Sequence, residues 1–125
     1  MDDRELLQRA NDARALAYIP YSGFAVGAAL LCADGTVFTG VNIENAAYGP
    51  SVCAERVAIF KAISEGRRDF VKLAVSCDGD HCRPCGICRQ VMFEHAPDME
   101  VLMGNPGGEF VRTTVRELLP DGFSM

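Results

Sequence analysis

The stretch VCAERVAIFKAISEG, residues 52–66, predicts a core helix whose first turn carries three chemically active side chains. Its apolar residues and its closing glycine are typical of a helix over about residues 52–65. An ordinary packed helix does not require a thiol, a carboxylate and a guanidinium at its start, yet Cys53, Glu55 and Arg56 stand there together. This first turn therefore indicates a functional site built into the fold.

The remaining chain alternates helical and strand patterns in the order helix, two strands, helix, strand, helix, two strands, helix. Helices are expected over residues 3–18 and 85–96 and shortly after Thr114, and strands over 24–32, 37–42, 70–77, 100–104 and 109–113. This order predicts a single α/β domain over residues 1–125, a three-layer α/β/α sandwich around a mixed five-stranded sheet.

Length and composition are those of a small cytosolic globular protein. The chain has 125 residues, of which 49% are apolar and 23% are charged. No apolar run approaches the roughly 20 residues that span a bilayer, and the acidic N-terminus is unlike a signal peptide. The formal net charge of −5 gives no broad attraction for phosphate backbones. We therefore expect a cytoplasmic protein with neither nucleic acid nor membrane as partner.

Three of the six cysteines have the spacing of ligands to one metal ion. Cys85 and Cys88 are three residues apart at the start of an expected helix, so their sulfur atoms lie on one face. Cys53, at the start of the preceding helix, would supply a third thiolate. Zinc prefers four ligands, and a site with three protein ligands keeps its fourth position for water, as catalytic zinc sites do.

The two charged neighbours of Cys53 suit such a site. Glu55 could reach the open position and carry protons between the water and a substrate without being a ligand. Arg56, three residues from Cys53 on the same helical face, could donate hydrogen bonds to the sulfur atoms. Three thiolates on Zn²⁺ leave a net negative charge, which this guanidinium would partly balance.

The other cysteines have alternative explanations. Cys82 or His81 could supply a fourth ligand and close the site into a structural zinc knuckle, but the carboxylate and guanidinium would then have no task. A loop thiol is the preferred interpretation of Cys82. Cys32 and Cys77 end apolar strands and are expected to be buried, inert thiols.

The motif Cys-x-Glu followed by Pro-Cys-x-x-Cys is the three-cysteine form of the zinc deaminase signature. The segments YSGFAVGAAL, TGVNIENAAYG, CAERVAIFKAISEG, PCGICRQV and VRELLPDGF occur in the order and spacing of the short, homotetrameric cytidine deaminases. The likeness runs from about residue 18 to residue 123, and the chain therefore resembles that family over nearly its whole length. It departs from the family at Arg83, where serine often precedes Pro-Cys.

This resemblance implies hydrolysis of free cytidine, and of deoxycytidine, to uridine or deoxyuridine plus ammonia, in pyrimidine salvage. It also implies one zinc ion per subunit and a homotetramer with sites shared between subunits. By the same resemblance, a zinc-bound hydroxide attacks C4 of cytosine while Glu55 protonates N3 and then helps ammonia to leave.

The resemblance assigns ribose binding to Asn42 and Glu44. These residues are two apart, so on an extended chain both side chains point to the same side. A carboxylate at this place repels phosphate, which favours nucleosides over nucleotides. Without the resemblance, the two would be polar residues at the end of a hairpin.

Four further residues receive roles in the same way. Phe24 packs near the nucleoside, although alone it would be an ordinary core residue, and the backbone at Ala54 reads the pyrimidine. Phe123 reaches into the site of a neighbouring subunit, or else simply caps the last helix. Tyr48 belongs to the loop that forms subunit contacts at the edge of the site.

Three rival functions remain open from the sequence. A deaminase of the same fold could act on another cytosine-bearing substrate, such as a nucleoside antibiotic, although the intact VNIEN segment, residues 41–45, weighs against it. A non-catalytic zinc-binding module is the rival from a different class. Editing of RNA or DNA is the third, and the acidic composition opposes it.

Overall fold

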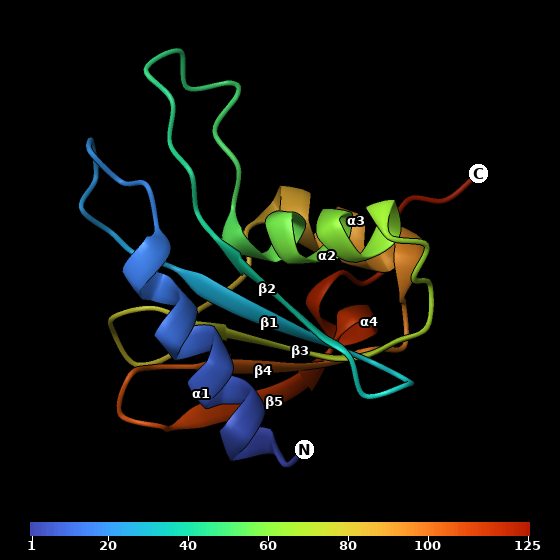
Figure 1. The fold of residues 1–125 in the computed structure, drawn as a ribbon. Helices are drawn as coiled ribbons and strands as arrows, with labels where there is room; N and C mark the ends of the chain where they lie inside the picture. The colour runs from blue at the N-terminus through green and yellow to red at the C-terminus, as the bar shows by residue number, and fades with distance from the viewer.

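Five strands form one mixed sheet in the order β2-β1-β3-β4-β5 (Figure 1). The computed structural model describes residues 1–125 and places β1 at Gly27–Cys32, β2 at Val37–Val41, β3 at Phe70–Ser76, β4 at Glu100–Gly104 and β5 at Phe110–Thr114. Only β3 and β4 run parallel, and every other neighbouring pair is antiparallel. The predicted mixed five-stranded sheet is therefore confirmed.

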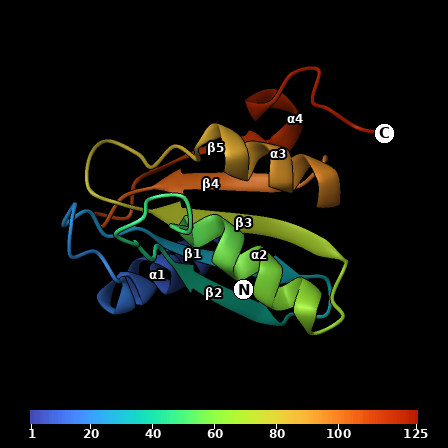
Figure 2. The same cartoon turned by 90° about the horizontal axis from the view of Figure 1, so that it is seen from above.

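Helices cover both faces of this sheet (Figures 1 and 2). Helix α1 (Asp3–Ala13) lies on one face, and α2 (Ala54–Ser64), α3 (Gly86–His95) and the short α4 (Val115–Leu118) lie on the other. Helix α1 buries its apolar side chains in a small cluster with the sheet, made of Leu6, Leu7, Ala10, Ala29, Ala74 and Leu102. The predicted three layers are confirmed. None of the helices is long and apolar enough to cross a membrane.

The central strands are buried because helices lie above and below them. Strand β1 is buried at five of its six residues, and the last four residues of β3 are all buried. The edge strand β2 alternates between buried and partly exposed residues, as expected of an edge strand covered mainly on one side. The long apolar runs of the sequence thus correspond to the middle of the sheet.

Helix α1 is shorter than the sequence predicts. Its α-helical part ends at Ala13, a single 3₁₀ turn (η1, Arg14–Leu16) follows, and the chain then becomes extended. The reason is a tertiary contact, because the backbone N–H of Tyr18 donates to Asn42 O at 3.0 Å, and Glu44 N donates back to Tyr18 O at 2.9 Å. This pairing with a distant segment overrides the helical pattern of residues 14–18.

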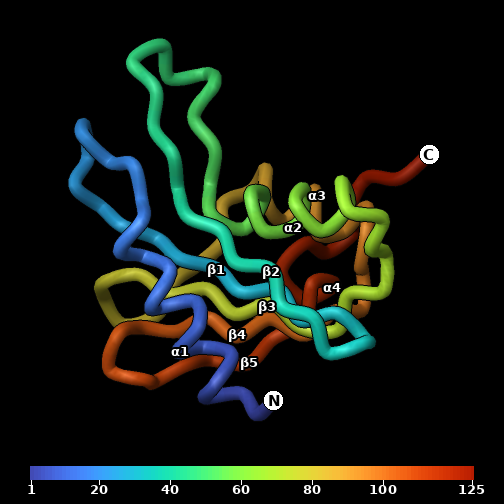
Figure 3. The backbone as a smooth tube through the Cα atoms, in the orientation of Figure 1, coloured from blue at the N-terminus to red at the C-terminus, as the bar shows by residue number.

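The first strand also begins later than expected, at Gly27 and not near Phe24. In the residues before Gly27, the Asn42 side chain bonds the backbone where a neighbouring strand would otherwise do so. Its Nδ2 donates to Phe24 O at 2.7 Å, and Val26 N donates to its Oδ1 at 3.0 Å. Residues 19–26 and 42–52 therefore project beyond the same end of the sheet (Figure 3). This end is where the functional residues gather.

Glycine in the middle of β2 brings α2 close to the sheet. A Cβ atom on Gly40 would lie 2.2 Å from Ala54 O and 2.6 Å from Ala58 N, distances at which atoms clash. The first turn of α2 therefore rests directly on the β2 backbone. This contact fixes the height of that turn, and hence of the residues Cys53 and Glu55, above the sheet.

Candidate active site

A cavity of about 440 Å³ opens where β3 ends and β1 begins. Twelve residues line it: Phe24, Val26, Asn42, Cys53, Glu55, Cys77, Asp78, Asp80, His81, Cys82, Arg83 and Cys85. The cavity thus combines predicted zinc ligands, the predicted proton carrier and two predicted substrate contacts with a loop that follows β3. Clefts beyond the carboxyl ends of parallel strands are the usual ligand sites of open α/β sheets.

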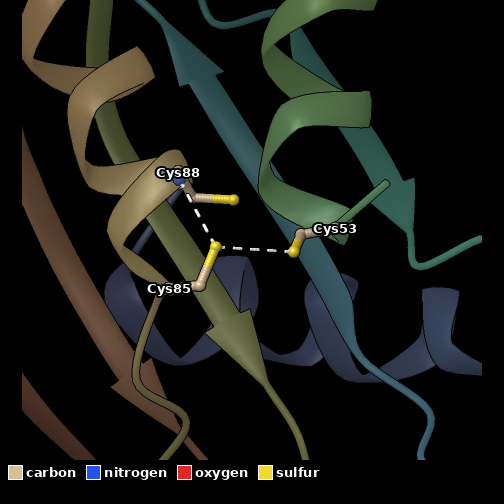
Figure 4. A group of neighbouring side chains, drawn as sticks. All are labelled: Cys53, Cys85 and Cys88. Atoms are coloured by element: carbon tan, nitrogen blue, oxygen red, sulfur yellow. Dashed lines mark hydrogen bonds between the residues drawn. The ribbon is translucent and has the colours of Figure 1, made fainter. Parts of the chain in front are cut away.

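Three sulfur atoms converge beside this cavity (Figure 4). The Sγ atoms of Cys53 and Cys85 are 3.6 Å apart, and the Sγ atoms of these two residues and Cys88 all lie within 4.8 Å of one another. Cys88 is fully buried, Cys53 is partly exposed and Cys85 is exposed. The sequence-predicted ligands are therefore brought together as a group able to hold one metal ion.

Helix geometry produces this convergence. Cys53 and Cys85 are the N-cap residues of α2 and α3, each with an extended backbone, and Cys88 lies in the first turn of α3. The backbone N–H of Cys88 points to the Cys85 sulfur at 3.5 Å (Figure 4). Unpaired N–H groups and the positive end of the helix dipole favour the anionic thiolate at both helix starts.

The spacing of the sulfur atoms suits zinc. Tetrahedral coordination with Zn–S bonds of about 2.3 Å places neighbouring sulfur atoms about 3.8 Å apart. The separation of 3.6 Å between Cys53 and Cys85 is close to this value. Three soft sulfur donors and no fourth cysteine in the group match a zinc site with one open position.

Hydrogen bonds between the cysteines shift the pKa values of Cys53 and Cys88 in opposite directions. A hydrogen bond from Cys88, together with the bonds from Arg56 and Cys85, lowers the pKa of Cys53 to about 5 although burial opposes it. The same bond to Cys53, reinforced by burial, raises the pKa of Cys88. The group therefore holds one thiolate readily, and a divalent cation would supply the positive charge that the further thiolates need.

Glu55 is a buried carboxyl group on the cavity wall. It is 3% exposed although it lies in the first turn of α2, next to the sulfur atoms. Burial raises the pKa of Glu55 to about 7, the charge of Cys53 acts in the same direction, and its own backbone amide and Arg56 oppose the shift. A carboxyl group with this pKa can both accept and donate a proton near neutral pH.

Arg56 points toward the sulfur group, as predicted. Its Nη2 atom donates to Cys53 Sγ at 3.5 Å, and its Nε atom is buried with no hydrogen-bond partner. A buried donor without a hydrogen-bond partner costs free energy, and negative charge close to the guanidinium offsets this cost. The thiolates that a metal would hold at this place provide such charge.

Asn42 and Glu44 hold the loop that forms one wall of the cavity. The Glu44 carboxylate accepts from the backbone N–H groups of Tyr21 and Ser22, each at 3.1 Å, and from the Ser22 hydroxyl. The Ser22 hydroxyl bond lowers the pKa of Glu44, which is therefore ionised. Only Asn42 lines the cavity, whereas Glu44 lines a smaller neighbouring pocket, of about 220 Å³, that also contains Asn42 and Cys53.

Phe24 lies on the cavity wall and is 46% exposed, so it is not an ordinary core residue. Ala54 is fully buried as the first residue of α2, where its backbone N–H has no partner within the helix.

Phe123 and Tyr48 lie away from the cavity of their own chain. Phe123 is 66% exposed and is fastened by Gln90, whose side chain bonds both its N–H and its C=O. Tyr48 is 80% exposed and adopts a positive φ of 62° in the projecting loop 42–52.

Two cysteine predictions require correction. Cys77 is buried as expected but is not a free thiol, because it forms a disulfide with Cys82. Cys82 is for the same reason neither a loop thiol nor an available ligand. Cys32 is a buried free thiol, as predicted.

His81, the other alternative fourth ligand, is not among the clustered sulfur ligands. It lines the cavity, with its Nδ1 atom 3.6 Å from an Asp80 oxygen, and is not in the metal-binding group. Neither Cys82 nor His81 therefore supplies the fourth ligand that a closed structural zinc site would need.

The sequence interpretation missed the loop that forms the opposite wall. Asp78, Asp80 and Arg83 line the cavity, and Arg83 bonds Asp80 through both terminal nitrogens at 3.2 Å. Asn105 fixes this loop by donating to Asp80 O at 2.9 Å. The position of this loop after a buried strand was the available signal, because cavities form at the carboxyl ends of such strands.

Comparison with known proteins defines the class. Residues 1–104 match the family described as the cytidine and deoxycytidylate deaminase zinc-binding region. The chain therefore belongs to this family and is a zinc-dependent hydrolytic deaminase.

Individual relatives agree with this assignment. The chain is 55% identical over 126 residues to a cytidine deaminase of Halalkalibacterium halodurans. This alignment covers 99% of this chain and 96% of that protein. It superimposes with a TM-score of 0.96 on the crystal structure of cytidine deaminase from Burkholderia pseudomallei, at 46% identity, over 98% of this chain and 100% of that one. It is also 38% identical over 104 residues to a blasticidin-S deaminase of Bacillus cereus, covering 76% of this chain and 74% of that protein.

The sulfur geometry predicts a difference between two cysteine substitutions. Cys85→Ser removes one of the three clustered sulfur atoms and should reduce bound zinc well below one ion per chain. Cys82→Ser removes a sulfur that is bonded to Cys77 and should leave zinc at one per chain. Metal analysis of the purified proteins after dialysis measures both. Loss of zinc in Cys82→Ser would contradict the three-cysteine site.

Proposed function

We propose that this protein hydrolyses free cytidine, and deoxycytidine, to uridine or deoxyuridine and ammonia for pyrimidine salvage. The observation that carries the proposal is a buried glutamate with a pKa of about 7 on the wall of a cavity beside which three cysteine sulfur atoms cluster. The cytidine deaminases similar to it over nearly the full chain support the choice of substrate. We propose that residues 1–125 form a single zinc domain, which supplies one such site.

Each residue of the site has a task in this reaction. Cys53, Cys85 and Cys88 would hold the ion, and zinc at that place supplies a Lewis acid that lowers the pKa of water to about 7. Arg56 would balance the charge of the sulfur atoms through the bond that it already makes to Cys53.

Glu55 moves the protons. Water contributes the oxygen that becomes the C4 carbonyl of uridine, and the bond between C4 and the amino nitrogen breaks. Glu55 takes a proton from the water and delivers it to N3 of the ring. It then takes the second proton of that water from the oxygen now bound to C4 and transfers it to the amino group, which leaves as ammonia. Its burial beside the sulfur atoms keeps the carboxyl group near the pKa that both steps require.

Polar groups near the projecting loops favour a nucleoside. We propose that Asn42 and Glu44 bind the ribose hydroxyls, that Phe24 packs against the nucleoside, and that the free N–H at Ala54 binds the pyrimidine. The ionised Glu44 carries negative charge at the edge of the site, which disfavours a phosphate there. Both side chains also position the loop before β1, so binding and loop geometry are linked.

A second substrate class has one observation in its favour. The chain is similar in sequence to a protein named blasticidin-S deaminase, which supports a nucleoside antibiotic as the alternative substrate. That relative matches over a smaller share of the chain and at lower identity than the cytidine deaminases. Cytidine is therefore the preferred substrate of the proposal.

Replacing Glu55 tests the proton-transfer role. Glu55→Gln should keep one zinc per chain, because Glu55 is not a ligand, and should lower kcat for cytidine by about 10²–10⁴-fold, the usual contribution of a general acid–base group. Ammonia release and zinc content are measured on the same preparation. Glu65→Gln, an exposed glutamate at the other end of α2, is the matched control and should leave both unchanged.

Two outcomes would contradict this account. Glu55→Gln with full zinc and full ammonia release would remove the proton-transfer role. A zinc-loaded wild type that releases no ammonia from cytidine, deoxycytidine or blasticidin S would favour a non-catalytic zinc module. Preference for the antibiotic over cytidine would favour the second substrate class.

We also propose a homotetramer in which Phe123 completes the site of a neighbouring subunit. Large apolar side chains are exposed at Leu16 (81%), Tyr48 (80%), Phe123 (66%) and Ile87 (62%). Burial of such groups between subunits would stabilise the assembly. Phe123 lies in a hollow near the C-terminus that shares no residue with the cavity of Glu55, so it has no place in the site of its own chain.

Mixed tetramers test this sharing directly. Light scattering should give four times the chain mass of 13.5 kDa. Phe123→Ala and Glu55→Gln proteins should each be weakly active alone. Mixing them under conditions that exchange subunits should restore activity, because some sites then combine an intact Glu55 with an intact neighbouring Phe123. A fully active monomer, or a tetramer without restoration, would contradict the shared site.

A further inference from the structure

Arg14 joins the two walls of the cavity without lining it. Its Nε atom donates to Ala25 O at 3.1 Å, and its Nη2 atom donates to Asp78 Oδ1 at 2.9 Å. Ala25 lies between Phe24 and Val26, which line one wall, and Asp78 belongs to the opposite wall. One guanidinium therefore bonds both sides of the substrate cavity from behind.

Arg14 bonds these two segments just beyond the point where backbone pairing between β1 and β3 ends. Strands β1 and β3 are antiparallel, and their ladder ends with Gly27 opposite Ser76. Two residues further, the same register brings Ala25 opposite Asp78, beyond the last pair of the ladder. The two chains leave the sheet at this point and become the walls of the cavity, and Arg14 connects them in place of a ladder bond.

Arg14 is itself held firmly. Its side chain is 17% exposed, and its Nη1 atom donates to Asn11 Oδ1 at 3.2 Å, which also accepts from the buried Ser76 hydroxyl at 3.1 Å. A Cβ atom on Gly27 would lie 1.9 Å from the Ala10 carbonyl oxygen and 3.0 Å from Arg14 Cγ. The absence of a side chain at Gly27 thus lets the end of α1 and the arginine stem rest on the start of β1.

We propose that Arg14 is a positioning residue that sets the separation of the two cavity walls and thereby the affinity for the pyrimidine nucleoside. The planar guanidinium presents several donors at fixed angles, so it can bond Ala25 and Asp78 at the same time. Asp78 is 74% exposed, and an ion pair so open to water contributes little to folding stability. The expected consequence of losing Arg14 is therefore a change in cavity geometry and substrate affinity.

This inference rests on the proposed deaminase function, because it concerns the substrate cavity of that reaction. A wall displaced by a fraction of an ångström weakens contacts with the bound nucleoside, and it does not remove a zinc ligand or the proton carrier. The effect should fall on binding more than on the chemical step.

The experiment compares Arg14→Gln and Arg14→Lys with the wild-type zinc enzyme. Both variants should raise KM for cytidine and the dissociation constant of the product uridine about tenfold, keep kcat within about twofold, and retain one zinc per chain. Lysine keeps the charge but lacks the planar fork, so it should not restore affinity. Uridine binding, measured by calorimetry, reports affinity independently of turnover.

Two further variants locate the effect. Asp78→Ala should raise KM in the same direction, and combined with Arg14→Gln it should add little, because both changes break one contact. The control is Arg67→Gln, which breaks an ion pair with Asp34 in the turn at the opposite end of β1. That change should leave KM and uridine affinity unaltered.

The outcomes separate this inference from the proposed function. The positioning role would be overturned if the wild type turns over cytidine while Arg14→Gln, Arg14→Lys and Asp78→Ala all keep the wild-type KM and uridine affinity. The deaminase assignment would then remain intact. Full affinity in Arg14→Lys, or parallel losses of zinc, kcat and melting temperature in the folded variants, would overturn it as well. A wild type inactive on cytidine would remove the function on which the inference rests.

Discussion

Three thiol groups are held within 4.8 Å of one another at the N-terminal ends of α2 and α3, and the other features of the site depend on this meeting point. The sheet makes it possible, because both helices lie on the same face and begin at the same end of it (Figures 1 and 4). Gly40 brings the start of α2 onto β2, and two N-cap positions then present their sulfur atoms to each other. A divalent cation offsets the repulsion that three thiolates would otherwise have.

The same concentration of charge explains the two residues beside the sulfur group. Arg56 has a buried nitrogen without a partner, which is tolerated next to anionic sulfur. Glu55 is kept from water and lies near Cys53, and both effects raise its pKa to about 7. In the proposed reaction, one short segment, residues 53–56, would thus supply a metal ligand, a proton carrier and a compensating charge, because the start of α2 places Cys53 and Glu55 on the cavity wall and Arg56 against the Cys53 sulfur.

The local sequence pattern predicted the helices, the strands and the chemically active residues, because strand burial and ligand spacing depend on residues close together in the sequence. The end of α1, the late start of β1 and the second wall of the cavity were not predictable in this way. They depend on partners distant in sequence, such as Tyr18 with Asn42, Asn105 with Asp80, and Arg14 with Asp78. The bond between Cys77 and Cys82 was not predictable because cysteine count alone fixes no pairing, and the cytoplasm expected for this chain disfavours disulfides.

X-ray absorption at the zinc edge of the purified holoprotein tests the central claim most directly, because it counts the atoms bound to the ion. Three sulfur atoms at about 2.3 Å and one oxygen at about 2.0 Å are the predicted result. Four sulfur atoms, or three sulfur atoms with an imidazole nitrogen, would show a closed structural site and contradict the account.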